Sequence, residues 1–429
     1  PLIVGINDTG KFIASDVPAI LQYTRTVYYV ENEEIVCLSN EHTRFCNIDG
    51  EPLEKQPVTI DWDIHAAEKG GYEHFMLKEI HEQPKAVRDT ISPRIHENEI
   101  DLGEIGMTDE EIKNLRKISI VACGSAYHTG AAGKYVIEEL ARIPVETDLA
   151  SEFRYRNPIY QENSLVIIVS QSGETADSLA ALRDAKAHGC KVLSIVNVVG
   201  SSIARESDAV LYTWAGPEIS VATTKAYSCQ LAVFYLLALK FAQIRSTITP
   251  DTFQTLLTAL KQLPDQIEGL LSQKEKIQFF ANHYLATEHI FFMGRGIDYA
   301  ISMEGSLKLK EISYIHSEAY AAGELKHGTI SLMEDGTLVV ALATQDALYP
   351  KTVSNMIEVK TRGAFVMALS TKKHPDIEKY ADYVLYIPET QNLFAGSLAI
   401  IPLQLFAYYV SLGRGLDVDK PRNLAKSVT

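Results

Sequence analysis

The sequence lacks the features that mark disulfide-rich, metal-binding and nucleic-acid-binding proteins. Its five cysteines are an odd number, widely spaced and without a Cys-x-x-Cys pair, which is typical of reduced thiols rather than of disulfides or zinc ligands. The formal net charge is -15 and no cluster of Lys and Arg forms a basic stripe, which argues against non-specific binding to nucleic acid. We therefore expect no metal, no cofactor and no nucleic-acid partner, and an anionic ligand would need a local site.

Long hydrophobic runs are also missing. The apolar stretch Leu231 to Leu239 is too short to span a membrane, and the stretch Leu398 to Leu412 is interrupted by Pro402 and Gln404. The segment Pro1 to Ser15 has no basic region followed by an uninterrupted apolar core, as a signal peptide would have. We expect both apolar stretches to be core helices of a cytoplasmic protein without a membrane partner.

A repeated pattern fills most of the chain. With 429 residues, 46% of them hydrophobic, the chain is expected to form two or three domains. From Lys117 onward, short apolar strands alternate with helical segments, which is typical of a parallel sheet covered by helices on both faces. Three strand-like runs recur in the same order 173 or 174 residues later. The matched pairs are 165–169 with 338–342, 192–196 with 366–370, and 208–212 with 382–386.

The segment before the repeat has a different character. Short strand candidates alternate there with turn signals, which is typical of antiparallel β structure, and a helical pattern over 64–90 predicts one or two linker helices. The predicted organisation is an antiparallel β segment over 1–62, a helical linker over 63–95, a first α/β domain over 96–268, a second over 269–415 and a tail over 416–429.

The most informative motif is the hexapeptide Ser170-Gln171-Ser172-Gly173-Glu174-Thr175. It follows an apolar strand and precedes a helical pattern, so hydroxyls and unpaired backbone N–H groups would gather at a helix N-terminus, where an anion is favoured. We predict a phosphate site there. The alternative is that Ser172 or Thr175 merely caps the helix. The second repeat has Ala343-Thr344-Gln345-Asp346 at this place and keeps no phosphate motif.

A second motif carries ionisable groups. Glu304, Lys308 and Glu311 are spaced by four and three residues, which places them on one face of a helix that follows the strand-like run 290–293. A carboxylate can move a proton between adjacent carbons while a nearby lysine polarises the oxygen on them. The alternative is a solvated stripe of salt bridges.

A histidine lies further along the second repeat. His327 is flanked by glycines in the run 323–328, and its ordinary pKa suits the acid/base chemistry of opening a sugar ring. A lone histidine in a loop is more often structural or solvated, so its role depends on the groups around it.

Together these motifs resemble the glucosamine-6-phosphate synthase family, the glutamine:fructose-6-phosphate aminotransferases (isomerizing). Five segments carry the resemblance: 170–175, 216–225, 304–316, 323–328 and 421–429. It extends over the whole chain, since Phe12 to Asp16, and Trp62-Asp63 with Ala66 to Leu77, are similar to the end of the family's glutaminase domain and the following linker.

The resemblance implies a fold and an activity. The expected fold is α/β, with two tandem flavodoxin-like SIS (sugar isomerase) domains preceded by the antiparallel β remnant of an Ntn-type glutaminase domain. The expected reaction is the synthesis of D-glucosamine 6-phosphate from D-fructose 6-phosphate with ammonia derived from glutamine. Ligands would be fructose 6-phosphate, glucose 6-phosphate or glucosamine 6-phosphate. The family's glutaminase uses an N-terminal cysteine, so a chain beginning at Pro1 is expected to accept ammonium but not glutamine.

The resemblance also implies residue roles. Glu311 would move the proton between C1 and C2, with Lys308 and Glu304 in the same site. His327 would open the ring from a neighbouring subunit, which makes a homodimer the smallest active unit, and Lys426 would form a Schiff base with the open-chain ketose. The substrate-binding residues would be Ser125, Ser170, Gln171, Ser172, Thr175 and Ala222.

One departure from the family and two alternative functions remain. Ala126 stands where the family often has a second hydroxyl, which puts one phosphate contact in doubt. A sugar-phosphate sensor would need the phosphate donors but not Glu311, His327 or Lys426. A deglycase or deaminase acting on amino sugars is the other alternative, and the glutaminase-like segment disfavours it.

Overall fold

The computed structural model of the protein describes residues 2–8, 10–14, 19–20, 23–31, 33–39, 41–60 and 68–426. The predicted domain boundary at residue 62 lies outside these residues, as do parts of three segments of the family resemblance. The parts concerned are Ser15, Asp16, Trp62, Asp63, Ala66, Ala67 and 427–429.

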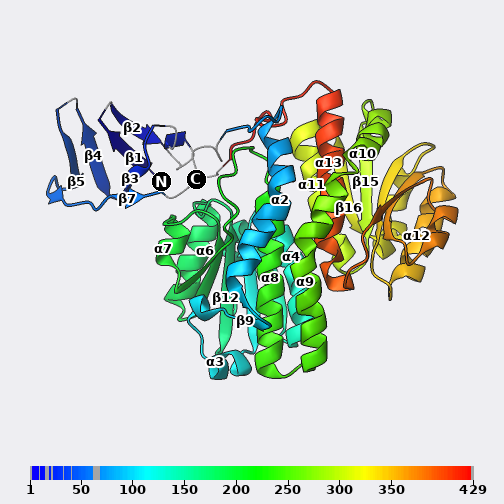
Figure 1. The fold of residues 1–429 in the computed structure, drawn as a ribbon, viewed down its shortest axis with the longest axis horizontal. Coiled ribbons are helices and arrows are strands. Elements are labelled where there is room, and N and C mark those ends of the chain that lie inside the picture. Colours follow the sequence, from blue (N-terminus) through cyan, green and yellow to red (C-terminus); the bar gives the residue numbers. More distant parts are fainter. Residues whose placement is uncertain are drawn as a thin grey trace.

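The described residues up to Ile60 form two small antiparallel sheets, as the alternating pattern predicts (Figure 1). One has the strand order β2-β1-β3-β7 and the other the order β4-β5-β6. The strands are β1 Leu2–Asn7, β2 Gly10–Ala14, β3 Thr26–Val30, β4 Glu34–Leu38, β5 Thr43–Asn47, β6 Pro52–Leu53 and β7 Val58–Thr59. The linker contains one long helix, α2 Phe75–Ile91, followed by the short hairpin of β8 Ile95–His96 and β9 Glu99–Ile100.

The first α/β domain is a five-stranded parallel sheet in the order β11-β10-β12-β13-β14. Helices connect successive strands and cover both faces of the sheet. The strands are therefore buried on both faces, which accounts for their continuous apolar runs. Its strands are β10 Lys117–Ala122, β11 Val145–Leu149, β12 Ser164–Ser170, β13 Lys191–Val196 and β14 Ala209–Tyr212. Its helices are α3 Asp109–Asn114, α4 Gly124–Ala141, α5 Ala150–Phe153, α6 Ala176–Ala187, α7 Ser202–Glu206, α8 Lys225–Arg245 and α9 Pro250–Leu271.

The second α/β domain repeats this sheet order as β16-β15-β17-β18-β19, again parallel, so the predicted duplication is confirmed. Its strands are β15 His289–Gly294, β16 His316–Ala321, β17 Leu338–Ala343, β18 Phe365–Thr371 and β19 Tyr383–Ile387. Its helices are α10 Lys274–Ala281, α11 Ile297–Ser313, α12 Tyr349–Lys360 and α13 Ala395–Gly413.

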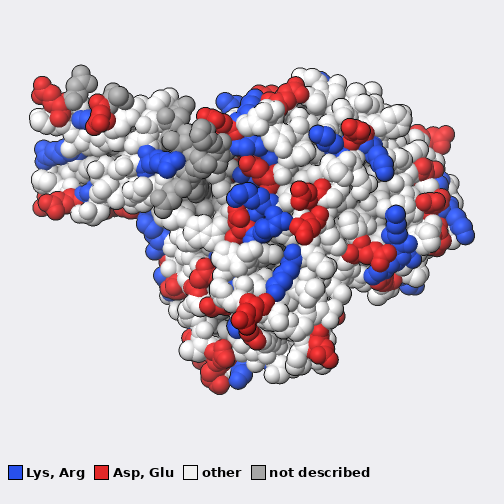
Figure 2. All heavy atoms as spheres, viewed as in Figure 1, with Lys and Arg blue, Asp and Glu red and all other residues white. Residues whose placement is uncertain are grey.

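The main core lies between the two sheets. Helices α2, α8, α9 and α13 run there side by side (Figure 1), and one continuous cluster of buried apolar residues joins both domains. Two helical segments, 225–245 and 392–413, are long and apolar enough to cross a membrane, but 83% and 94% of their apolar windows are buried. The prediction that the apolar stretches are core helices is therefore confirmed. On the face shown in Figure 2, acidic and basic side chains are intermixed.

Candidate active site

A cavity of about 520 Å³ lies beyond the carboxyl ends of β10 and β12. Ligands of parallel α/β sheets usually bind at this edge, so the position matches the expectation from the sequence. Its lining includes five of the predicted substrate-binding residues together with Glu311 and Lys426. The polar and charged lining residues are Ser125, Ser170, Gln171, Ser172, Thr175, Asp177, Thr223, Gln230, Glu311 and Lys426.

The hydroxyls of the hexapeptide loop hold the loop itself in shape. Ser170 Oγ accepts a hydrogen bond from Gly173 N at 3.0 Å and lies 3.1 Å from Thr175 Oγ1, while Ser172 Oγ accepts from Glu174 N at 3.2 Å. Thr175 is the N-cap residue of α6, but its side chain makes no capping hydrogen bond. The alternative that Thr175 caps the helix is therefore wrong.

Glycine is required at position 173. Its φ is +68°, a conformation that side chains with a Cβ rarely adopt, and an added Cβ would lie 2.0 Å from Ser201 Oγ. The loop thus packs tightly against Ser201 at the start of α7, and this contact leaves no room for a side chain at position 173.

The predicted trio on α11 converges on one buried lysine. Lys308 Nζ lies 2.6 Å from Glu311 Oε2 and 3.4 Å from Glu304 Oε1, and it donates to Ser125 Oγ at 3.0 Å. The side chains of Glu304 and Lys308 are fully buried, and that of Glu311 is 22% exposed. A solvated stripe of salt bridges is therefore the wrong interpretation, because only Glu311 reaches the cavity.

Charge pairing keeps this buried network ionised. Burial alone would favour neutral groups, but Lys308 and His128 outweigh it and hold the pKa of Glu304 below its ordinary value. In the same way Glu304 and Glu311 overcome the burial of Lys308 and raise its pKa. The network thus presents a fixed ammonium directly behind the Glu311 carboxylate.

His128 was not predicted from the sequence. Its Nδ1 lies 2.8 Å from Glu304 Oε2, and Ser125 Oγ donates to the other carboxylate oxygen at 2.9 Å. Both residues are on α4, three positions apart, and therefore face the same way. That spacing is the signal that could have found His128, but only if the crossing of α4 over α11 had been known.

The tail reaches the same cavity through Lys426, whose ammonium meets a carboxylate that was not predicted. Lys426 Nζ donates to Glu218 Oε2 and to Ser220 O, both at 2.8 Å. Burial opposes the ionisation of Glu218, but Lys426 and hydrogen bonds from neighbouring backbone outweigh it and hold its pKa below the ordinary value. A second buried carboxyl, Glu79 on α2, accepts from Ile219 N at 2.5 Å, and its pKa is raised by burial and by Glu218.

His327 and Ala222 do not line this cavity with their side chains, and for His327 this agrees with the expectation that it acts from a neighbouring subunit. His327 is exposed, at the end of the 3-10 helix Ala322–His327, and is not among the residues that line the cavity. The side chain of Ala222 is buried, although its neighbours Val221 and Thr223 line the cavity. Ala126 also lines the cavity and contributes no hydroxyl there.

In the second domain, the loop that corresponds to the hexapeptide is hydrogen-bonded to a buried carboxylate of its own chain, Asp298. The Asp298 carboxylate accepts from Thr344 N at 2.9 Å, from Thr344 Oγ1 at 2.5 Å and from Gln345 Nε2 at 3.4 Å. Thr344 and Gln345 stand where Gln171 and Ser172 stand in the first repeat. Burial outweighs these hydrogen bonds and raises the pKa of Asp298 to about 6.

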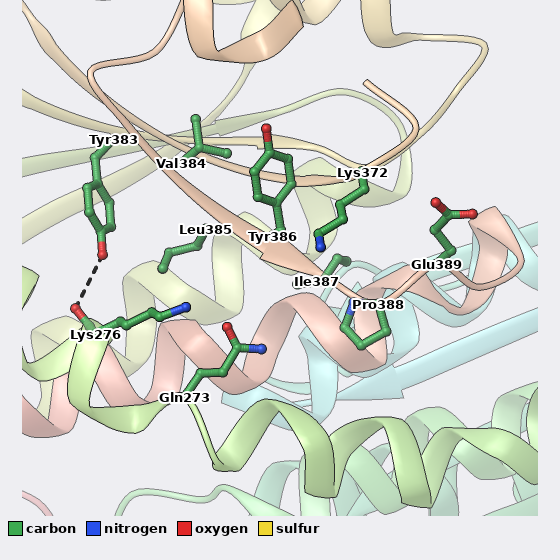
Figure 3. A pocket seen from close by; sticks show the side chains of 10 residues that line it. All are labelled: Gln273, Lys276, Lys372, Tyr383, Val384, Leu385, Tyr386, Ile387, Pro388 and Glu389. Atoms are coloured by element: carbon green, nitrogen blue, oxygen red, sulfur yellow. Dashed lines mark hydrogen bonds between the residues drawn. The ribbon is translucent and has the colours of Figure 1, made fainter. Parts of the chain in front are cut away.

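A hollow of about 430 Å³ runs along the edge strand β19 (Figure 3). Tyr383 Oη donates to Lys276 O at 3.3 Å across it. None of the predicted site residues lines it. Within the described ranges, no group of three or more His, Cys, Asp and Glu side chains is arranged to hold a metal ion.

Comparison with known proteins assigns the class first. Residues 111–240 and 284–413 each match the model of the SIS domain, so the chain is a tandem SIS-domain protein.

Full-length similarity then defines the family. The chain is 57% identical over 430 residues to glutamine–fructose-6-phosphate aminotransferase [isomerizing] of Clostridium acetobutylicum, covering 100% of this chain and 71% of that protein. The corresponding enzyme of Caldanaerobacter subterraneus is 56% identical with the same coverage. The C-terminal domain of glucosamine-fructose-6-phosphate aminotransferase from Francisella tularensis superposes with a TM-score of 0.79 at 39% identity, covering 82% of this chain and 100% of that one. The chain therefore belongs to the glutamine–fructose-6-phosphate aminotransferase (isomerizing) family.

Proposed function

We propose that this chain binds D-fructose 6-phosphate in the cavity beyond β10 and β12 and carries out the isomerase and synthase half of D-glucosamine 6-phosphate formation. The single observation that carries this proposal is that the hexapeptide loop and Glu311 line one cavity although they come from different SIS domains. A phosphate anchored at the loop would place a sugar chain within reach of a carboxylate.

The loop hydroxyls are proposed to hold the phosphate. Ser125, Ser170, Ser172 and Thr175 supply hydroxyl donors and Gln171 an amide, and the N-terminus of α6 adds unpaired N–H groups. Ala222 would contribute through its backbone, since its side chain is buried between two lining residues.

Glu311 is proposed to transfer the proton. Its carboxylate removes a proton from C1 of the open-chain ketose and returns it to C2, while electrons move through the enediol, so that glucose 6-phosphate forms without ammonia. When ammonia has replaced the C2 oxygen, the same transfer converts the imine to the amino aldose. Lys308, 2.6 Å behind Glu311, stabilises the carboxylate, and Glu304 fixes Lys308.

The remaining roles involve the tail and a second subunit. Lys426 is proposed to form a Schiff base with the open-chain ketose when ammonia is absent. His327 is proposed to open the sugar ring in the cavity of a neighbouring subunit, because it is exposed and does not line the cavity of its own chain. The active form is then a homodimer, and we propose that it works in the cytoplasm without a nucleic-acid or membrane partner.

Substituting Glu311 by glutamine tests the proton transfer. In D2O, the Glu311→Gln variant is expected to isomerise fructose 6-phosphate at least about 100-fold more slowly and to lose deuterium incorporation at C1 to the same extent. Affinity for fructose 6-phosphate, measured by calorimetry, should change little because the loop is intact. Glu318→Gln on β16 is the matched control and should keep the wild-type rate. Normal exchange in Glu311→Gln would remove this residue from the role of base.

A further inference from the structure

The tail lysine occupies a prepared position at the edge of the cavity. Its ammonium contacts the Glu218 carboxylate and the Ser220 carbonyl, both at 2.8 Å. Glu218 is 2% exposed, so this contact lies in a region of low dielectric where a charge pair is strong. The lysine is therefore held in place by a charge pair and a backbone carbonyl.

Glu218 is itself fixed by other donors. Its Oε1 accepts from Thr224 N at 3.0 Å and from Ala226 N at 3.2 Å, and its Oε2 accepts from Thr223 Oγ1 at 3.0 Å. A carboxylate with this many donors is a poor proton acceptor. It can hold an ammonium in place but does not activate it by taking its proton.

Several other charged or titratable groups act on Glu218 and on this end of the cavity. They are Glu79 and Glu82 on α2, Lys225 and Cys229 on α8, and Lys308 on α11. Lys225 is already paired with Glu82 at 2.7 Å and Lys308 with Glu311 at 2.6 Å. Neither of these lysines is placed to replace Lys426 as the direct partner of Glu218.

The tail is anchored independently of its lysine. The Asp419 carboxylate accepts from Phe75 N at 2.9 Å and from Met76 N at 2.8 Å at the start of α2, and Asp419 O accepts from Val221 N at 2.9 Å. The helix N-terminus favours this carboxylate. Lys426 can thus leave Glu218 without release of the tail from residues 218–224.

Lys426 also brings a positive charge to the lining of the cavity. Among the described residues that line it, Lys426 is the one cation, whereas Asp177 and Glu311 are acidic. An incoming phosphate ester would meet two carboxylates unless this ammonium were present, because like charges repel in a partly buried site.

We propose that Glu218 is a positioning residue for Lys426. Together with Ser220 it holds the tail lysine as an ammonium that attracts the phosphate ester and does not react. The lysine becomes a nucleophile only after leaving Glu218: it releases one proton to solvent, its amine adds to the C2 carbonyl, and loss of one water gives the imine. Imine formation rests on the proposed function of Lys426, whereas the holding of its ammonium by Glu218 does not.

Site-resolved acetylation of the full chain tests the holding step without substrate. The rate at which acetic anhydride modifies Lys426 is compared with that of the exposed Lys420 by mass spectrometry at pH 7. In Glu218→Gln, Lys426 is expected to react on the order of tenfold faster, since loss of a hydrogen bond to a charged partner releases the side chain from its held position about that much more often. Lys420 should be unchanged. Glu82→Gln, which removes the partner of Lys225, should leave Lys426 as in the wild type.

A second variant keeps the test decisive if Glu218→Gln does not fold. Asp419→Ala removes the side-chain anchor of the tail on α2 and leaves Glu218 unchanged, and it should also raise the acetylation rate of Lys426, by about threefold to tenfold. An unchanged or slower rate at Lys426 in the folded variants would overturn the proposal.

Trapping with fructose 6-phosphate and cyanoborohydride separates this inference from the proposed function. Without ammonium, Glu218→Gln is expected to yield more of the reduced adduct on Lys426 at pH 7 than the wild type. Faster acetylation with no adduct on Lys426 would uphold the holding role of Glu218 and remove the Schiff base. An adduct in the wild type that does not increase in Glu218→Gln would uphold the Schiff base on Lys426 and overturn the holding role of Glu218.

Discussion

The two SIS domains end their corresponding strands in different ways. In the first domain, β12 leads into a loop of hydroxyls beside a cavity of about 520 Å³. In the second, β17 leads into Thr344 and Gln345, whose donors are taken up by the buried Asp298 carboxylate. The scaffold was kept in both copies, but one loop faces a cavity while the other is satisfied by its own chain. An internal carboxylate thus occupies the place where an external anion would bind.

The largest effect is expected from Gly173→Ala, which changes only the loop of the first domain. The added methyl would lie 2.0 Å from Ser201 Oγ at a φ of +68°, so the loop must move. We expect a loss of about 1–3 kcal/mol in stability and at least a tenfold loss of affinity for fructose 6-phosphate, measured by thermal unfolding and calorimetry. Asp346→Ala, at the equivalent position of the second repeat, should leave affinity unchanged and cost below about 1 kcal/mol. Equal losses of affinity in both variants would contradict the division between the loops.

Asp298→Asn is expected to change the pH dependence of stability. The pKa of Asp298 is about 6 in the folded chain against an ordinary 3.8, so between these values the native state binds more protons than the unfolded state. Stability of the wild type therefore falls as pH rises from about 4 to about 6, by up to about 3 kcal/mol. The variant should lack this loss. Urea unfolding at several pH values measures it, and parallel profiles for the two proteins would show that Asp298 does not titrate in this range.

The smallest effect is expected from Ala126→Ser, which adds a hydroxyl to the lining of the first cavity. Ala126 follows Gly124 by two positions, as Asp298 follows Gly296, so the two residues occupy matched places at the start of α4 and α11. The new donor should tighten fructose 6-phosphate binding about twofold to fivefold, which corresponds to about 0.5–1 kcal/mol. The exposed Ala187→Ser is the control. Weaker binding would mean that the cavity has no room for the hydroxyl.

Features that produce a regular pattern along the sequence were predicted correctly. The parallel strands follow from apolar runs bounded by turns, and their duplication follows from the matched spacing. The common face of Glu304, Lys308 and Glu311 follows from helical periodicity alone. Family resemblance supplied the activity, which these patterns do not contain.

Features that depend on contacts across the chain were not predicted. His128 and Glu304 are separated by 176 residues and meet only because α4 crosses α11. Glu218 and Lys426 are 208 residues apart, and the tail has no periodic pattern that would locate its lysine. Asp298 was overlooked because a single carboxylate at the start of a helix is ordinary in sequence, and its burial comes from β17 and the loop that follows it.

The hydrogen bond from Lys308 to Ser125 joins the two SIS domains, so a substitution in one domain affects the geometry of the other. Ser125 belongs to the first SIS domain and Lys308 to the second, so their hydrogen bond of 3.0 Å forms only when the two domains keep one relative position. A recombination event that exchanged one copy for a distant homologue would preserve both sheets and still misalign the phosphate loop against Glu311. Substitutions along the contact of α4 with α11 are therefore expected to occur in compensating pairs.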